Sequence, residues 1–232
     1  MRLQKFLAHA GLCSRRKAEI HIAQGRVAVN GRTVTAPGVK VNPDTDQVAF
    51  RGEPVQLTPG TVKITIALNK PKGYVTTCAQ DNARIVLELV DVPERLYPVG
   101  RLDKDSTGLL LLTNDGELHN RLSHPSFDHE KEYVVTTVRP ISDTHLKAMA
   151  SGMRINGQMT RKAKVRRLSG NRFKIVLKQG LNRQIRKMVR LTGNRVRSLK
   201  RIRMSQIRLQ GLEPGQWRHL SRQELESLKS EN

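Results

Sequence analysis

Cysteine, aromatic residues and long apolar runs are all scarce in this chain of 232 residues. The two cysteines, Cys13 and Cys78, are too few for a disulfide framework, and neither belongs to a Cys/His cluster of the kind that binds zinc. No segment approaches the ~18 consecutive apolar residues of a membrane-spanning helix. The start of the chain lacks the apolar stretch of a secretion signal. We therefore expect a soluble, cytoplasmic protein without structural zinc.

Acidic residues are also scarce, and over one long stretch they are absent. The chain has 20 acidic residues against 42 lysines and arginines, which gives a formal net charge of +22. Residues 144–212 contain no Asp or Glu but hold 20 of the 42 basic residues. A short basic run is often just a solvated face, but this bias persists over several predicted elements. It indicates a polyanionic partner, with the phosphate backbone of nucleic acid as the first candidate. Aromatic residues, at 3%, are too few to stack successive bases.

The N-terminal part reads as a small module of two helices and a short sheet. Helices are predicted over residues 3–10 and 14–24, the second with Ser14 as its cap. A tight turn at Asn30-Gly31 predicts a hairpin, and Val39, Val41, Val48 and Phe50 supply the remaining short strands.

The second predicted helix begins with Arg15, Arg16 and Lys17. Cations are unfavourable near a helix N-terminus, but together with the free N–H groups they would gather an external phosphate. The alternative is three solvated side chains.

A turn-rich segment, residues 51–62, is predicted to be a linker between domains 1–58 and 63–232. The second domain mixes strands and helices without regular βαβ repetition, which favours the α+β class. The predicted strands cover residues 62–68, 109–112, 131–138, 173–177 and 197–204. The predicted helices cover residues 84–90, 117–122, 142–151 and 182–192, with a last helix capped by Ser221.

A polar loop bounded by Gly100 and Gly108 precedes the predicted strand of four leucines. Such a loop, anchored by a buried strand, is a good place to fix a carboxylate. Asp103 and Asp105 are two residues apart and should point in different directions, so a hydrolase with paired carboxylates is a poor fit. On this segment alone, a surface turn with satisfied aspartates is the commoner interpretation.

The Asp103 loop and the strand after it form an extended motif, Gly100-Arg101-Leu102-Asp103 followed by Thr107-Gly108-Leu109-Leu110-Leu111-Leu112-Thr113-Asn114-Asp115-Gly116. This motif resembles the catalytic signature of RNA pseudouridine synthases of the RsuA group. Three further stretches resemble other motifs of the family in the same order: Lys70-Pro71-Lys72-Gly73, His129-Glu130-Lys131-Glu132-Tyr133, and Gly180 to Met188 with Val196 to Arg201 continuing it. The N-terminal module resembles the alpha-L (ribosomal protein S4-like) RNA-binding domain that precedes the catalytic domain in this group.

The resemblance implies the fold, the activity and the site residues. The fold would be a small S4-like domain followed by a catalytic domain with a mixed, mainly antiparallel sheet. The activity would be the isomerisation of uridine to pseudouridine, with no cofactor and no metal. The implied catalytic residues are Asp103, Tyr133 and Arg186. The implied substrate pocket includes Arg101, Leu102 and Leu199. The candidate RNA-binding residues are the basic residues of the predicted helices and of the first motif: Arg15, Arg16, Lys17, Lys70, Arg183, Lys187 and Arg190.

The implied chemistry suits these residue types. A carboxylate at Asp103 would act as nucleophile or base at the sugar, and a guanidinium at Arg186 would favour its ionised form. Tyr133 offers a flat ring against uracil and a hydroxyl near the sugar. The target uridine must leave its helix or loop, so base flipping is expected. Without the resemblance, Tyr133 and Leu199 would more often be core residues and Arg186 a phosphate contact.

Within the family, His129-Glu130-Lys131-Glu132-Tyr133 and Gly180 to Arg186 resemble the RluF-type subgroup. This resemblance favours large-subunit 23S ribosomal RNA as the substrate. Small-subunit ribosomal RNA, a tRNA or an assembling ribosomal particle remain alternatives, as does a non-catalytic ribosomal RNA-binding or ribosome-assembly factor. We expect a monomer, because no coiled-coil or other self-association seam is present, and no membrane partner. His119, His124 and His129 are irregularly spaced, so metal binding is not expected.

Overall fold

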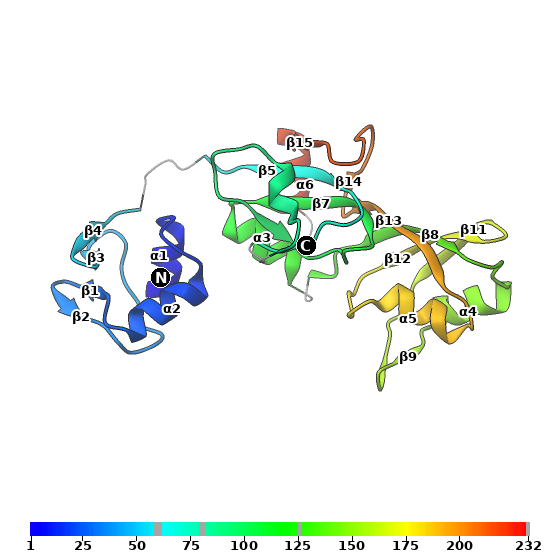
Figure 1. The fold of residues 1–232 in the computed structure, drawn as a ribbon, viewed down its shortest axis with the longest axis horizontal. Helices are drawn as coiled ribbons and strands as arrows, with labels where there is room; N and C mark the ends of the chain where they lie inside the picture. Colours follow the sequence, from blue (N-terminus) through cyan, green and yellow to red (C-terminus); the bar gives the residue numbers. More distant parts are fainter. Residues whose placement is uncertain (58–61, 79–81, 125–126, 231–232) are drawn as a thin grey trace. The chain divides into compact units, whose positions relative to one another are not determined.

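The computed structural model divides the chain into two compact units, Met1–Val62 and Lys63–Asn232. It describes residues 1–57, 62–78, 82–124 and 127–230. Figure 1 shows the order of the elements in each unit. No helix in these ranges is long and apolar enough to cross a membrane.

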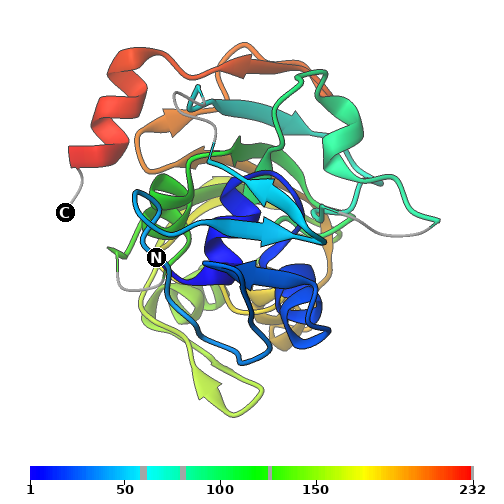
Figure 2. The same ribbon diagram turned by 90° about the vertical axis from the view of Figure 1, so that its left-hand side faces the viewer.

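The first unit packs two helices on a four-stranded sheet, with α1 and α2 on one side of the strands (Figures 1 and 2). Its elements are α1 (Leu3–His9), α2 (Arg15–Ala23), β1 (Val27–Val29), β2 (Arg32–Thr33), β3 (Val48–Phe50) and β4 (Glu53–Val55). Both predicted helices and the hairpin at Asn30-Gly31 are confirmed. The predicted strands at Val39 and Val41 are wrong. Among the described residues, this segment forms only an isolated β-bridge, between Lys40 and Arg2.

The linker prediction is wrong over its first residues. Arg51 and Gly52 have φ values of +55° and +89° and form the turn of a hairpin that joins β3 to β4. Pro54 fits into β4 because a strand at the edge of a sheet can lack one N–H donor. Residues 58–61, which include the rest of the predicted linker's turn residues, lie outside the described ranges.

The second unit is built on one large sheet with the strand order β11-β12-β8-β13-β7-β5-β15. Its strands are β5 (Thr65–Lys70), β6 (Tyr97–Val99), β7 (Thr107–Thr113), β8 (Lys131–Thr137), β11 (Lys164–Ser169), β12 (Arg172–Leu177), β13 (Val196–Met204), β14 (Ile207–Arg208) and β15 (Trp217–His219), with a separate hairpin of β9 (Arg154–Ile155) and β10 (Gln158–Met159). Among the strand pairs of the described residues, β7 with β13 is parallel and the others are antiparallel. The predicted α+β class with a mainly antiparallel sheet is confirmed.

The helices of this unit end close to where the sequence predicts. They are the 3-10 helix η1 (Val86–Leu89) and the α-helices α3 (Gly116–Ser123), α4 (Asp143–Ser151), α5 (Gln184–Leu191) and α6 (Arg222–Ser230). The strand predicted over residues 62–68 begins at Thr65 and continues to Lys70. β6, β11 and β15 were not predicted, because their segments lack a clear apolar alternation.

Alternate residues of the strands pack into separate clusters on the two faces of the sheet. Leu109 and Leu111 of β7 join the cluster of α3 and α6, whereas Leu110 and Leu112 join the cluster that contains η1. On β8, β12 and β13 a third cluster packs against α4 and α5. Tyr133 belongs to both of the last two clusters, which therefore lie on the same face.

Candidate active site

Asp103 lies on the loop between β6 and β7, and the backbone of this loop is fixed on both sides of it. The buried Leu102 donates its N–H to the Thr76 hydroxyl (3.2 Å), and the same hydroxyl donates to the Leu102 carbonyl (2.8 Å). The Ser106 N–H donates to the Asp103 carbonyl (3.0 Å) and closes the turn. The side chain of Asp103 is 29% exposed, so it opens to solvent from a rigid frame.

Lys70 holds this loop from beneath and is not available to RNA. Its side chain is completely buried, and its Nζ donates to the carbonyl oxygens of Pro71 (2.9 Å), Lys104 (3.4 Å) and Ser106 (2.8 Å). The N–H of Gly73 donates to the Lys104 carbonyl as well (2.9 Å). The prediction that Lys70 contacts RNA is wrong, because strand β5 carries it into the interior.

The electrostatics around Lys70 are set by its burial. Desolvation lowers the pKa of its ammonium to about 8, and the negative charges of Asp103 and Asp105 oppose that shift. A buried ammonium of this kind is stable only where its N–H groups find acceptors. Three backbone carbonyls accept these N–H groups. Lys70 therefore fixes the backbone of the loop, and the loop supplies the acceptors that stabilise the buried ammonium.

Two arginines face the Asp103 carboxylate. The Nε of Arg186 lies 3.7 Å from Asp103 Oδ2, and Nη1 of Arg183 lies 3.8 Å from the same oxygen. Arg186 is also tied to the loop, because its Nη2 donates to the Asp105 carbonyl (3.1 Å) and to the Ser106 hydroxyl (3.2 Å). The side chain of Arg186 is 15% exposed against 46% for Arg183, so Arg186 is the more firmly placed of the two.

The pKa of Arg186 is lowered, first by burial and then by the positive charge of Arg183, while Asp103 and Asp105 act in the opposite direction. A guanidinium stays protonated despite such a shift, so Arg186 can hold an ionised carboxylate without losing its proton. The ion pairs at 3.7 and 3.8 Å are longer than hydrogen bonds. The carboxylate is therefore neutralised by charge and not locked by direct hydrogen bonds to either arginine.

Helix α5 positions these arginines through its apolar side. Ile185, Met188 and Val189 are buried in the cluster that packs α5 against the sheet. Arg183 has a φ of +53° and occupies the N-cap position, so it precedes the helix instead of lying in its first turn. The side chain of Gln184 accepts a hydrogen bond from the Leu181 N–H (3.1 Å) and stabilises this start.

The parallel pairing of β7 and β13 brings the third predicted catalytic residue to the same side of the sheet. Arg201 pairs with Gly108 of β7 and with Tyr133 of β8. A Cβ on Gly108 would lie 2.2 Å from the Arg201 carbonyl oxygen, so only glycine permits this approach. The half-buried ring of Tyr133 packs in the same cluster as Leu102, the neighbour of Asp103.

The remaining predicted residues fall into three groups. Leu199 is buried and pairs with Val135 in the cluster between the sheet and the helices α4 and α5. Arg101 is exposed on the Asp103 loop. On α5, Arg190 is exposed and Lys187 Nζ donates to the Asn182 side chain (3.4 Å).

The other predicted RNA-binding residues, Arg15, Arg16 and Lys17, are exposed in the first turn of α2. The cap is confirmed there, because the Ser14 hydroxyl accepts from the Lys17 N–H (3.2 Å). These three residues belong to the first unit.

Sequence reasoning missed the supports of the site. The Thr76 hydroxyl binds the loop at the Leu102 carbonyl, and the Ser106 hydroxyl accepts a hydrogen bond from Arg186. The Nε of the buried Arg201 donates to the Leu109 carbonyl (2.6 Å). Ser106 stands within the loop that the sequence singles out, but nothing in the local pattern marks its hydroxyl as buried. Within the described ranges, no cluster of three or more His, Cys, Asp or Glu residues could hold a metal ion.

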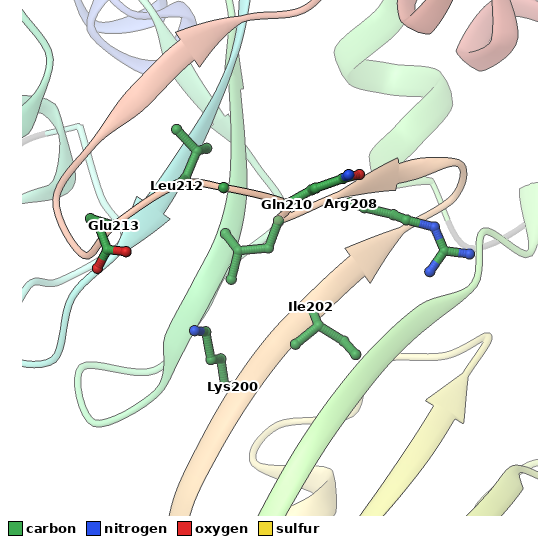
Figure 3. A pocket seen from close by; sticks show the side chains of 8 residues that line it. Lys200, Ile202, Arg208, Gln210, Leu212 and Glu213 are labelled. Carbon is green, nitrogen blue, oxygen red and sulfur yellow. The ribbon is translucent and has the colours of Figure 1, made fainter.

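A groove of about 410 Å³ lies elsewhere on the second unit (Figure 3). Its lining residues are Lys200, Ile202, Arg208, Leu209, Gln210, Gly211, Leu212 and Glu213. None of the predicted site residues lines it, although Lys200 follows Leu199 directly.

Comparison with protein families identifies both units. Residues 64–191 match the model of the RNA pseudouridylate synthase family, and residues 1–47 match the S4 domain. The first match covers more than half of the chain.

Curated relatives and a solved structure agree with these matches. The chain is 41% identical over 225 residues to the dual-specificity RNA pseudouridine synthase RluF of Escherichia coli (strain K12), covering 97% of this chain and 77% of the relative. It is 38% identical over 237 residues to the ribosomal large subunit pseudouridine synthase B of Bacillus subtilis (strain 168), covering 99% and 96%. A crystal structure of a pseudouridylate synthase matches with a TM-score of 0.73 and 32% identity, covering 98% of this chain and 99% of the other.

Proposed function

The chain belongs to the RNA pseudouridylate synthase family and is an RNA pseudouridine synthase, and we propose that it isomerises a uridine of large-subunit 23S ribosomal RNA with Asp103 as the catalytic carboxylate. The observation that carries this assignment is the frame around Asp103. Its carboxylate stands on a loop whose backbone is bonded on both sides, and two guanidinium groups face one of its oxygens.

The roles follow from that geometry. The reaction breaks the bond between N1 of uracil and the ribose, turns the base and forms a new bond through C5. Asp103 would act at the sugar as nucleophile or base, and Arg186 would face its carboxylate with a positive charge and orient it. Tyr133 lies at the junction of the two clusters on this face, where its ring could contact a uracil that has left its stack.

The two units divide the work in this proposal. The S4-like unit, which we place at residues 1–58, adds affinity and placement through Arg15, Arg16 and Lys17. The catalytic unit, residues 63–232, adds phosphate contacts through Arg183, Lys187 and Arg190 and lines the pocket with Arg101, Leu102 and Leu199. We propose a cytoplasmic monomer without a cofactor.

The large-subunit target is supported by the name of the Bacillus relative and by the similarity to the RluF-type enzymes. Small-subunit ribosomal RNA, a tRNA and an assembling ribosomal particle are the alternatives that a substrate panel would separate.

A tritium-release assay tests the catalytic role of Asp103. RNA labelled at uracil C5 is incubated with the wild type and with Asp103→Asn, because forming pseudouridine displaces that hydrogen. We expect release by the wild type and a loss of roughly 10⁴-fold or more in the variant, with RNA affinity largely retained.

The outcome also separates an enzyme from a binding factor, because no release by either protein from any of these RNAs would favour the binding factor. Release by Asp103→Asn at the wild-type rate would move the catalytic role to another residue. Release from tRNA or small-subunit RNA, but not from 23S RNA, would replace the proposed target.

A further inference from the structure

The half of the sheet formed by β8, β11, β12 and β13 is covered by helices on one face. The buried side chains of Val135, Phe173 and Ile175 point to α4 and α5. In Figure 1 these two helices lie below the strands. On the other face, among the described residues, no helix covers the alternate side chains, and most are exposed or half-buried.

This open face, which carries Glu132, Val134, Arg166, Arg172, Lys174 and Lys200, has a basic row across four strands. Arg166 pairs with Lys174, Lys174 with Val134, and Val134 with Lys200, so the four side chains stand side by side on one face. At the usual spacing between strands, the row spans about 14 Å. Arg172 stands one row away, beside Thr136.

Two acidic residues beside the basic row, Glu130 and Glu132, are already paired with cations, one of which is Lys174 of the row itself. Glu213 lies further on, in the lining of the groove. Glu130 accepts from Arg203 (2.8 Å) and Lys164 (3.1 Å), and the hydrogen bond from Arg203 is the largest cause of its lowered pKa. Glu132 is paired with Arg203 (3.0 Å) and Lys174 (3.1 Å).

Three cations remain for an external partner. Arg166, Arg172 and Lys200 are exposed and have no ion pair among the residues that the structure describes.

The groove of Figure 3 continues the row beyond Lys200. Lys200 and Arg208 contribute positive charge to its lining, and Ile202 and Leu212 contribute apolar surface. Because Lys200 belongs to both, the basic row and the groove form one continuous surface.

The face carries charge but no rings. Among its described side chains there is no Phe, Tyr or Trp, so it cannot stack unpaired bases as aromatic sheet surfaces do. Unpaired guanidinium and ammonium groups on a broad surface suit phosphates whose positions are fixed by a duplex.

We propose that the open face binds the phosphate backbone of an RNA duplex, as a second contact surface on the opposite side of the sheet from Asp103. The inference rests on the proposed function only in taking RNA as the partner. The open face would hold a flanking helix of the substrate while the target uridine is presented to the catalytic loop.

The test compares two triple variants of the full-length chain that lose the same charge. Arg166→Gln/Arg172→Gln/Lys200→Gln removes the unpaired cations of the open face. The control, Lys147→Gln/Arg222→Gln/Lys229→Gln, removes three exposed cations from α4 and α6. Affinity for a 20-base-pair RNA duplex and for a single-stranded oligouridine is measured at several salt concentrations.

We expect the first variant to bind the duplex on the order of tenfold to a hundredfold more weakly at moderate salt. Its slope of log affinity against log salt should fall by about two to three, one contact for each cation removed. The control should stay near wild type, and Arg166→Lys/Arg172→Lys/Lys200→Arg should restore most of the affinity.

Equal losses in the two triple variants, or no loss in either, would overturn the proposal. A loss confined to the oligouridine would replace the duplex with a single strand. Because binding and not isomerisation is measured, the answer does not depend on the role of Asp103.

Discussion

The cations of α2 and the cations around Asp103 are the same residue types in opposite surroundings. Arg15, Arg16 and Lys17 are exposed and have no acidic residue in their helical turn. Lys70 is completely buried and Arg186 nearly so, and both donate to the backbone of the catalytic loop. Composition alone counts all five as positive charge.

The difference in burial separates affinity from reaction rate. An exposed cation attracts phosphate over a distance and is screened by salt. A buried cation costs free energy to desolvate, and this cost is offset only where its N–H groups find acceptors. It then fixes the position of those acceptors. The comparison therefore predicts that variants of the first set change RNA binding, whereas variants of the second set change catalysis and folding.

Among the variants of these cations, the largest effect should come from Arg186→Gln. This change removes the charge that lies 3.7 Å from Asp103 and the two hydrogen bonds that tie Arg186 of α5 to the loop. We expect isomerisation at saturating RNA to fall about a thousandfold, which corresponds to about 4 kcal/mol, with a much smaller change in affinity. Single-turnover tritium release measures the rate, and Arg186→Lys should recover part of it.

Arg190→Gln is the matched control, because Arg190 lies one turn along the same helix but is exposed. It should weaken RNA binding slightly and leave the rate of a single turnover nearly intact. If both variants lose the same rate, burial does not separate the two classes of cation.

The next effect concerns the stability of the loop and depends on pH. The pKa of Lys70 is about 8 in the folded protein and 10.5 ordinarily, so the unfolded chain binds more protons between these values. The contribution of Lys70 to stability is therefore greatest above pH 10.5, is lost as the pH falls towards 8, and is constant below that. Relative to Lys70→Met, the wild type should gain up to about 3 kcal/mol across this window. Denaturant unfolding of both proteins at pH 7.5 to 10.5 measures the difference, and a parallel pH dependence would contradict it.

The sequence predicts the surface of this site better than its support. The Asp103 loop is bounded by glycines and followed by four leucines, which indicates an anchored carboxylate. The apolar residues of α5 recur at helical spacing, so the placement of Arg186 on its polar side could be predicted. Both patterns depend only on residues that are close together in the sequence, so they can be recognised without the tertiary structure.

The buried cations could not be predicted, because their burial depends on partners far away in the sequence. Lys70 meets the carbonyl of Ser106, 36 residues later, and Arg201 meets that of Leu109, 92 residues earlier. A lysine at the end of a strand is normally expected at the surface. The hairpin of β3 and β4 was missed because of a local ambiguity and not because of distant partners. Its turn residues are equally typical of a linker.

The exposed cations of α2 should affect RNA binding more than the reaction rate. Arg15→Gln/Arg16→Gln/Lys17→Gln should weaken binding to the RNA substrate roughly tenfold to a hundredfold and lower the salt slope by two to three. The loss should appear in the RNA concentration needed for half-maximal rate and far less in the rate at saturation. The same experiment with Arg186→Gln should give the reverse pattern. Loss of saturating rate in the α2 variant would mean that the first unit also shapes the catalytic site.

The smallest effect tests whether the α2 cations act together with the helix N-terminus. The Ser14 hydroxyl caps α2 and the Ser142 hydroxyl caps α4, each accepting an N–H at 3.2 Å. Either change to Ala should cost about 1 kcal/mol of local stability. The settings differ, because α4 begins with Asp143 and α2 with cations that favour a bound phosphate.

Amide hydrogen exchange, with and without RNA, distinguishes these settings. If a phosphate reaches the first-turn N–H groups of α2, RNA should restore most of the protection that Ser14→Ala removes, because the phosphate takes the place of the hydroxyl as acceptor. RNA should leave the effect of Ser142→Ala unchanged. An equal, RNA-independent cost at both caps would show that Arg15, Arg16 and Lys17 attract RNA as solvated side chains only, and the exposed set would then act purely through long-range charge.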